Sequence, residues 1–179
     1  SVAIAKNAWN WGIRMEIVDA NPWAGMKFPR ATKQNPRNLS LFERRKVFAS
    51  AASEARPIQV ALSLALYAGL RLGEILRLDM GALTWGPSGF IRLAPGKDGE
   101  PRSTVFPPEL QTAMAPFREG DGRVMPSEVT HRLVQRRTRA VSKRAGVAFS
   151  IHDLRRTFAR LMIEGGANPL DVRDMLGHS

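Results

Sequence analysis

The sequence lacks several residue types that common functional sites need. It has no cysteine, which excludes disulfide bonds, thiolate catalysis and zinc sites built from cysteine. Its three histidines do not have the spacing of metal ligands. No apolar run approaches the roughly 20 residues of a membrane-spanning helix, and the N-terminus carries no signal-peptide pattern. We therefore expect a cytoplasmic protein with no metal site and no cofactor.

Acidic residues are also scarce relative to basic ones. The chain carries 27 Lys and Arg against 16 Asp and Glu, which gives a formal net charge of +11 and a pI near 11.3. Such a charge indicates an anionic partner, most commonly a nucleic-acid backbone, with an anionic membrane surface as the second possibility. The length of 179 residues and the hydrophobic content of 44% are typical of one well-buried domain with a small appendage.

Residues 1–30 are too apolar for a free tail. Trp9, Trp11 and Ile13 lie in a helical pattern that one short helix could not bury alone, so we expect the remnant of a helical domain. Packing is a better explanation for these tryptophans than base stacking. The polar residues 31–38 predict a basic linker, after which a second domain begins at residue 39.

The second domain opens with two predicted helices and a glycine corner. Ser40, with Glu43 three residues later, predicts a helix over 40–52, and Pro57 opens an apolar helix that Gly69 stops. Arg71 then lies at a glycine-flanked corner, where Glu74 could hold its guanidinium group. The alternative is an ordinary ion pair within one helix.

A hairpin is predicted next. Residues 90–93 and 103–106 have the character of strands, and Asp98-Gly99 between them is a strong turn signal. A third strand is expected near 83–85. Lys97 would lie near the exposed tip, either as a solubilising lysine or as a mobile proton donor. The order of elements predicts an α+β fold, mainly helical, with one small antiparallel sheet.

A long basic helix is predicted from Ser127 to Ala145, closed by Gly146. One sign of charge dominates its surface, which favours contact with DNA phosphates over a merely solvated face. His131 receives no role. The candidate DNA-binding residues are Arg132, Arg136, Arg137, Arg139, Lys143 and Arg144.

The stretch from Ser150 to Phe158 concentrates basic chemistry at a predicted helix start. Ser150 and Asp153 form a capping-box pattern, and His152 and Arg155 share the first turn, where unpaired N–H groups favour an anion. A phosphate would fit there, although a solvated helix start is the alternative. We expect Arg155 at the flank of the apolar stripe, so that its removal would hardly change the melting temperature.

Four motifs in order resemble the signature of the tyrosine recombinase (phage integrase) family, over about residues 39 to 179. They are Ala68-Gly69-Leu70-Arg71-Leu72-Gly73-Glu74, Lys97 in a hairpin, His152-Asp153-Leu154-Arg155 and Leu176-Gly177-His178-Ser179. Residues 1–30, with Asn10-Trp11-Gly12 followed by Asn21-Pro22, resemble the end of that family's core-binding domain.

The resemblance implies a site-specific recombinase that breaks and rejoins DNA through a covalent 3′-phosphotyrosine. Arg71 and Arg155 would clamp the scissile phosphate, and Lys97 would protonate the departing 5′ oxygen. His152 would assist proton movement at the attacking side. His178 would bond the phosphate or the nucleophile, and Glu74 would orient the site. The implied partners are double-stranded DNA and other protomers, as a tetramer on DNA, with no membrane.

The nucleophile departs from the family pattern. The family's tyrosine follows the Gly-His motif, whereas this sequence ends at Ser179 and its single tyrosine, Tyr67, falls in the apolar helix before Gly69. We therefore expect a catalytic-domain fragment that is inactive alone, with the nucleophile beyond Ser179 and Tyr67 packed in the core. The alternative is a non-catalytic DNA-binding regulator of recombination with the same fold.

Overall fold

The computed structural model describes residues 2–26, 37–95, 101–117 and 122–177. By its internal contacts the chain divides into two compact units, Ser1–Asn35 and Pro36–Ser179. Most of the predicted linker, 31–38, lies outside the described residues. Within the described residues, no helix combines the length and apolar character needed to cross a bilayer.

The described part of the first unit, residues 2–26, contains one helix, α1 (Val2–Arg14), and the turns that follow it. The side chain of Asn21 donates to the backbone carbonyl of Lys6 at 3.2 Å and to Oδ1 of Asn10 at 2.5 Å, which fixes the turns against the helix. Trp11 is 50% exposed and Ile13 is 37% exposed. The unit therefore leaves much of its apolar surface uncovered, as a single helix must.

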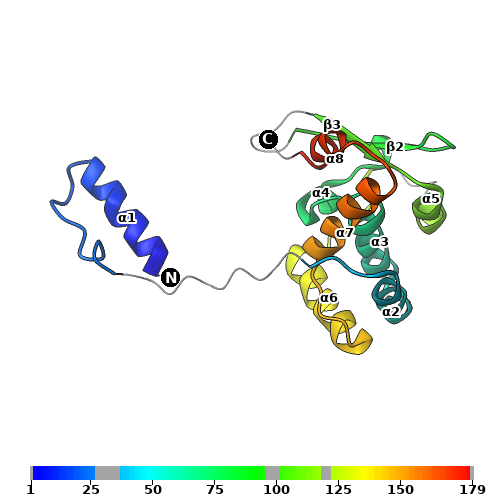
Figure 1. Cartoon of the computed structure of the whole chain (residues 1–179), viewed down its shortest axis with the longest axis horizontal. Coiled ribbons are helices and arrows are strands. Elements are labelled where there is room, and N and C mark those ends of the chain that lie inside the picture. The colour runs from blue at the N-terminus through cyan, green and yellow to red at the C-terminus, as the bar shows by residue number, and fades with distance from the viewer. Residues whose placement is uncertain (1, 27–36, 96–100, 118–121, 178–179) are drawn as a thin grey trace. The chain divides into compact units, whose positions relative to one another are not determined.

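The second unit is mainly helical with one small sheet (Figure 1), which confirms the predicted α+β class. Its helices and strands are α2 (Leu41–Ala51), α3 (Arg56–Tyr67), α4 (Leu72–Arg77), β1 (Leu83–Thr84), β2 (Phe90–Leu93), β3 (Arg102–Val105), α5 (Pro108–Met114), α6 (His131–Ala145), α7 (Ile151–Glu164) and α8 (Pro169–Leu176), with short 3₁₀ turns at Met80–Ala82 and Ala115–Phe117.

The sheet has three antiparallel strands in the order β1-β2-β3. Ile91 lies opposite Thr104, and both are buried, because alternate residues of a strand face the core. The third strand near Leu83 is confirmed, and β3 begins at Arg102, one residue earlier than predicted. The turn residues 96–100, including Lys97, lie outside the described part of the chain.

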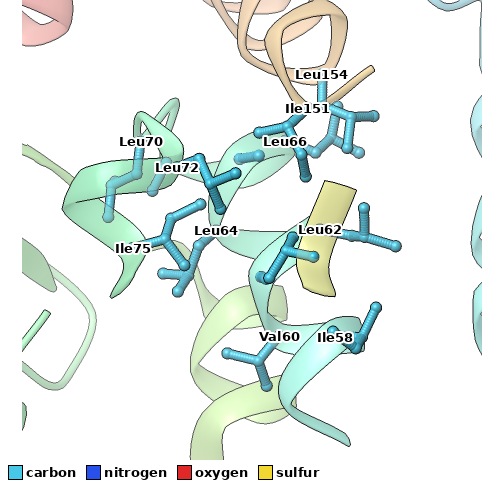
Figure 2. Close-up of a cluster of buried hydrophobic side chains, with 14 of the residues drawn as sticks. Ile58, Val60, Leu62, Leu64, Leu66, Leu70, Leu72, Ile75, Ile151 and Leu154 are labelled. Carbon is cyan, nitrogen blue, oxygen red and sulfur yellow. The ribbon is translucent and has the colours of Figure 1, made fainter. Parts of the chain in front are cut away.

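Helix α3 forms the centre of the core. Its residues from Val60 to Leu66 are all buried, so it packs on every side rather than along one stripe. Helix α7 packs against it and brings Ile151 and Leu154 into the same cluster as Leu64 (Figure 2). The start of α7 is thereby fixed against α3 and the corner that follows it.

A smaller cluster fixes the last helix. Phe158 of α7 packs with Val172 and Leu176 of α8, and α8 also lies against β3 (Figure 1). Asn168 caps α8 by accepting from the backbone N–H of Leu170 at 2.9 Å. The C-terminal end of α8 thus approaches the start of α7, the corner before α4 and the edge of the sheet.

Candidate active site

Local capping positions the first turn of α7. Oδ2 of Asp153 accepts from the backbone N–H of Ser150 at 2.9 Å, and the Ser150 hydroxyl accepts from the Asp153 N–H at 3.3 Å. This reciprocal pair confirms the predicted capping box and satisfies two backbone donors that a helix start otherwise leaves open. It places His152 and Arg155 within the same helical turn.

The corner before α4 positions Arg71. Gly69 has a φ of +65°, and a Cβ there would overlap the ring of Phe158, so only glycine fits. Arg71 is the extended residue that precedes α4, and its backbone N–H donates to Oε2 of Glu74 at 2.7 Å. The Arg71 side chain remains 43% exposed. Its backbone is therefore fixed while its guanidinium group is accessible.

Glu74 is the acidic centre of this cluster. Its Oε1 accepts from Nη2 of Arg102 at 2.7 Å and from Nη1 of Arg71 at 3.2 Å, while Oε2 lies 3.8 Å from Nη1 of Arg155. Burial acts to raise the pKa of Glu74, but the Arg71 N–H and the positive charges of Arg102 and Arg155 outweigh it and lower the pKa. Glu74 is thus held as a carboxylate.

The end of α8 completes the cluster. Three successive carbonyl groups there each accept a hydrogen bond from a different arginine, because the C-terminal end of a helix exposes carbonyls and attracts cations. The pairs are Arg102 Nη1 with Met175, Arg155 Nη2 with Leu176, and Arg71 Nη2 with Gly177 at 2.8 Å. These arginines come from β3, α7 and the corner before α4, so the site exists only once all of these elements have packed.

Arg155 differs from the sequence-based expectation. It was expected at the flank of its helix, yet it is only 2% exposed and donates to the carbonyl of Gly69 as well as that of Leu176. Burial, together with the charge of Arg71, lowers the pKa of Arg155 to about 10. The apolar periodicity of a helix shows which of its faces packs against the core, but it does not show what covers the residues beside that face. Here the Gly69 corner and α8 cover Arg155.

His152 lies on the exposed side of the same turn. Partial desolvation and then the charges of Arg156 and Arg155 lower its pKa, although Asp153 opposes them. A histidine with a lowered pKa is neutral at pH 7 and can accept a proton. His152, Arg71 and Arg155 line one cleft of about 560 Å³, which is also lined by His131, Gln135 and Arg139 of α6.

Two of the sequence-predicted site residues, Lys97 and His178, lie outside the described residues. The described ones, Arg71, Glu74, His152 and Arg155, are brought together. Sequence reasoning missed Arg102, which bonds Glu74 directly, and it assigned no role to His131, which faces the cleft. The signal for Arg102 was absent because its partners lie 28 and 73 residues away. Tyr67 packs against Phe48, with the ring centroids 5.9 Å apart, in agreement with the predicted packing role.

The basic helix α6 begins later than predicted. Thr130 caps it and it starts at His131, because Ser127 and Glu128 form a turn in which the N–H of Val129 donates to the carbonyl of Pro126. Five of its arginine and lysine residues are exposed, namely Arg132, Arg136, Arg139, Lys143 and Arg144.

Two arginines of α6, Arg137 and Arg144, bind an internal carboxylate. Nε of Arg137 lies 2.5 Å from Oε2 of Glu54, and Nη2 of Arg144 pairs with Oε1. The side chain of Glu54 is fully buried, which acts to raise its pKa, but the bonds from Arg144 and Arg137 lower it overall. Arg137 and Arg144 therefore tie α6 to the end of α2, and part of their charge is neutralised within the protein.

The arrangement as a whole suits an anion. Three guanidinium groups surround one carboxylate, so the described cluster carries a net charge of +2. Planar guanidinium donors match the oxygens of a phosphate, and like charges this close repel one another until an anion is present. A phosphodiester at the cleft would relieve that repulsion.

Comparison with known proteins finds similar sequences and similar folds over nearly the whole chain. The chain is 26% identical over 192 residues to tyrosine recombinase XerC of Actinobacillus pleuropneumoniae serotype 7, covering 98% of this chain and 62% of that protein. The chain thus spans roughly three fifths of the length of that curated relative. Among solved structures, a lambda integrase dimer bound to a COC′ core site gives a TM-score of 0.77 at 18% identity, covering 99% of this chain and 70% of the other. A lambda integrase tetramer bound to a Holliday junction gives 0.76 at 18% identity, covering 97% and 56%.

The family assignment rests on the sequence match, since structural likeness at this level of identity shows only the fold. The model of the phage integrase family matches residues 39–179, which is most of the chain and contains every described residue of the cluster. This chain belongs to the phage integrase family.

Proposed function

We propose that the protein containing this chain is a site-specific DNA recombinase that cuts and rejoins strands through a covalent 3′-phosphotyrosine. The observation that carries the proposal is the convergence of Arg71 and Arg155, which both lie near the Glu74 carboxylate and line one cleft. One arginine comes from the corner before α4 and the other from α7, and they differ in exposure, since Arg71 is accessible and Arg155 is buried. Together they can hold the non-bridging oxygens of a phosphate in a fixed orientation.

The proposed reaction moves one phosphorus between two oxygens. A tyrosine outside this sequence attacks the scissile phosphorus, the new bond to the tyrosine oxygen forms, and the bond to the 5′ oxygen breaks. His152, neutral at pH 7, accepts the proton of the attacking hydroxyl, and Lys97 gives a proton to the 5′ oxygen. Arg71 and Arg155 stabilise the charge that builds on the phosphate oxygens. His178 would bond the phosphate or the nucleophile.

The nucleophile is not Tyr67 in this proposal. Tyr67 is partly buried at the end of α3 and its ring packs against Phe48, so it belongs to the core. It cannot leave that position without disrupting the packing around it. A tyrosine from chain that follows Ser179, or from another piece of chain, fits the proposal better.

We also propose how DNA is held. The exposed basic residues of α6 would contact phosphates on either side of the scissile one, because Arg139 already lines the cleft that holds Arg71. The paired residues Arg137 and Arg144 would contribute less. By analogy with the integrase complexes above, the active form would be a tetramer on double-stranded DNA. Residues 1–30 would be the end of a core-binding domain, joined by the linker 31–38 to the catalytic domain, 39–179.

A strand-cleavage assay tests the proposal. A protein extended past Ser179 would first select its binding site from random duplexes, and that site would be built into a nicked suicide substrate. We expect a covalent protein–DNA adduct that protease digestion converts to a peptide-linked strand. Arg71→Ala should abolish the adduct, whereas Arg92→Ala, an exposed residue of β2, should retain it.

The absence of any adduct on a tightly bound site would refute catalysis. That outcome, with specific binding intact, would instead support a DNA-binding regulator of recombination with the same fold.

A further inference from the structure

Arg102 on β3 has an unusual position for an arginine. Its side chain is only 11% exposed, and it reaches out of the sheet to two other elements. Nη2 donates to Oε1 of Glu74 at 2.7 Å, and Nη1 donates to the carbonyl of Met175 at the end of α8. It therefore joins the sheet, α4 and α8 through one planar group.

The bond to Glu74 places Arg102 in competition with Arg71. Both arginines donate to the same oxygen, Oε1, but Arg102 is closer, at 2.7 Å against 3.2 Å. A charge-assisted hydrogen bond weakens as it lengthens, so Arg102 holds the larger share of that carboxylate. Arg71 keeps a looser bond, and its half-exposed side chain has further N–H groups for an outside anion.

The bond to Met175 orders the carbonyls that the other two arginines use. Gly177, which ends α8, has a φ of +62°, and a Cβ there would lie 2.8 Å from Nε of Arg102. The side chain of Arg102 thus lies directly against this turn. Because Arg155 and Arg71 bond the next two carbonyls, the position of Arg102 sets where both of their guanidinium groups are held.

We infer that Arg102 is a positioning residue for the phosphate site: by occupying Glu74 and fixing the end of α8, it leaves the Arg71 guanidinium available to the phosphate. The inference rests on the proposed function, because the phosphate is the ligand proposed there. Without Arg102, Glu74 would draw Arg71 into a closer ion pair. The net charge of the cluster would also fall from +2 to +1, since one of its three guanidinium groups is lost.

The test uses the 179-residue chain and orthophosphate at constant ionic strength. The arginine Nε–Hε signals are recorded by NMR, and Arg71 is assigned with an Arg71→Lys variant. In the wild type, phosphate should shift the Arg71 signal. In Arg102→Gln we expect the phosphate dissociation constant to rise about tenfold, as for the loss of one charge-assisted contact. Arg92→Gln removes the same charge from the neighbouring strand and should leave the constant nearly unchanged.

A double variant separates positioning from a structural role. Arg102→Gln combined with Glu74→Gln removes the carboxylate that would recapture Arg71 and returns the cluster to a charge of +2. Phosphate affinity should therefore recover toward the wild-type value. If Arg102 only held the fold together, the second substitution would weaken binding further, and that result would overturn the inference.

The remaining outcomes are also decisive. Equal phosphate affinity in Arg102→Gln and Arg92→Gln would refute the inference. If Arg102→Gln does not fold, Arg102→Lys replaces it, because lysine keeps the charge but lacks the two separate guanidinium nitrogens that bond Glu74 and Met175. An affinity for Arg102→Lys equal to wild type would then refute it. If phosphate does not shift the Arg71 signal of the wild-type chain, that result would count against the proposed function itself. This outcome distinguishes a failure of the proposed function from a failure of the inference about Arg102.

Discussion

The Arg155→Ala substitution should lower the stability of the folded chain as well as its activity. The buried guanidinium group donates to the carbonyls of Gly69 and Leu176 and lies 3.8 Å from Glu74. Alanine removes these donors and leaves their partners in a site that water reaches poorly. An exposed arginine at the flank of the helix, which the sequence suggested, could be removed without leaving buried carbonyl groups that lack a hydrogen-bond donor.

The magnitude follows from two opposing effects. The pKa of Arg155 is lowered from 12.5 to about 10. At about 1.4 kcal/mol per pKa unit, keeping this side chain charged in the folded state costs about 3 kcal/mol. Two charge-assisted hydrogen bonds offset this by about 1.5–3 kcal/mol each, and the buried methylene groups add about 0.8 kcal/mol each. Alanine removes the cost and the gains together, so we expect a net loss of about 2 kcal/mol in the free energy of unfolding.

Urea unfolding followed by circular dichroism measures this directly. A loss of about 2 kcal/mol corresponds to a fall of roughly 4–8 °C in Tm for a domain of this size. Arg139→Ala is the matched control, because Arg139 is exposed on α6 and its loss should change stability by less than about 0.5 kcal/mol. Equal stability of the two variants would refute the role of Arg155 in joining α7, the Gly69 corner and α8.

The catalytic effect of the same substitution can be separated from stability. In a protein extended past Ser179, assayed well below its Tm, loss of a transition-state donor should raise the barrier by about 2.7–4 kcal/mol. Arg139→Ala should lower affinity modestly and leave the single-turnover rate at saturating DNA almost intact. Equal reductions of that rate would exclude Arg155 as a phosphate clamp.

Three further predictions concern charge. NMR titration of His152 should give a midpoint below the ordinary histidine value, and Arg156→Gln should raise it, because Arg156 is the first of the charges that lower this pKa; an unchanged midpoint would contradict the assignment. Glu54→Gln should lower the free energy of unfolding by about 2 kcal/mol at pH 7, as for a broken buried charge pair. Because the pKa of Glu54 is lowered in the folded state, its contribution to stability is present above the ordinary glutamate pKa and is lost as pH falls through the folded-state pKa. The difference in free energy of unfolding between the wild type and Glu54→Gln should therefore become smaller in acid. For duplex DNA of arbitrary sequence, log affinity should fall linearly with log salt, with a slope of about −0.9 per phosphate contacted, and a flat response would exclude phosphate contact.

The elements that the sequence predicts well are those fixed by neighbours in the chain. The capping pairs Ser40 with Glu43 and Ser150 with Asp153 form as expected, since each joins residues three apart. Gly69 stops the apolar segment as predicted, and its positive φ is a conformation that favours glycine. The start of α6 was placed too early, because the turn at Ser127 also offers a serine before an acidic residue, and only the hydrogen bonds of the folded chain select Thr130 as the cap.

The sequence by itself determined the class of the fold, the basic character of the surface and the family motifs around Arg71 and Arg155. These depend on composition, on periodicity and on residues close in the chain. Only the tertiary structure decided that Arg155 is buried, that Arg102 binds Glu74 and that Glu54 neutralises two arginines of α6. These contacts join residues between 21 and 90 positions apart. No local pattern records such pairs, because they form only when separate helices and strands pack around a shared core.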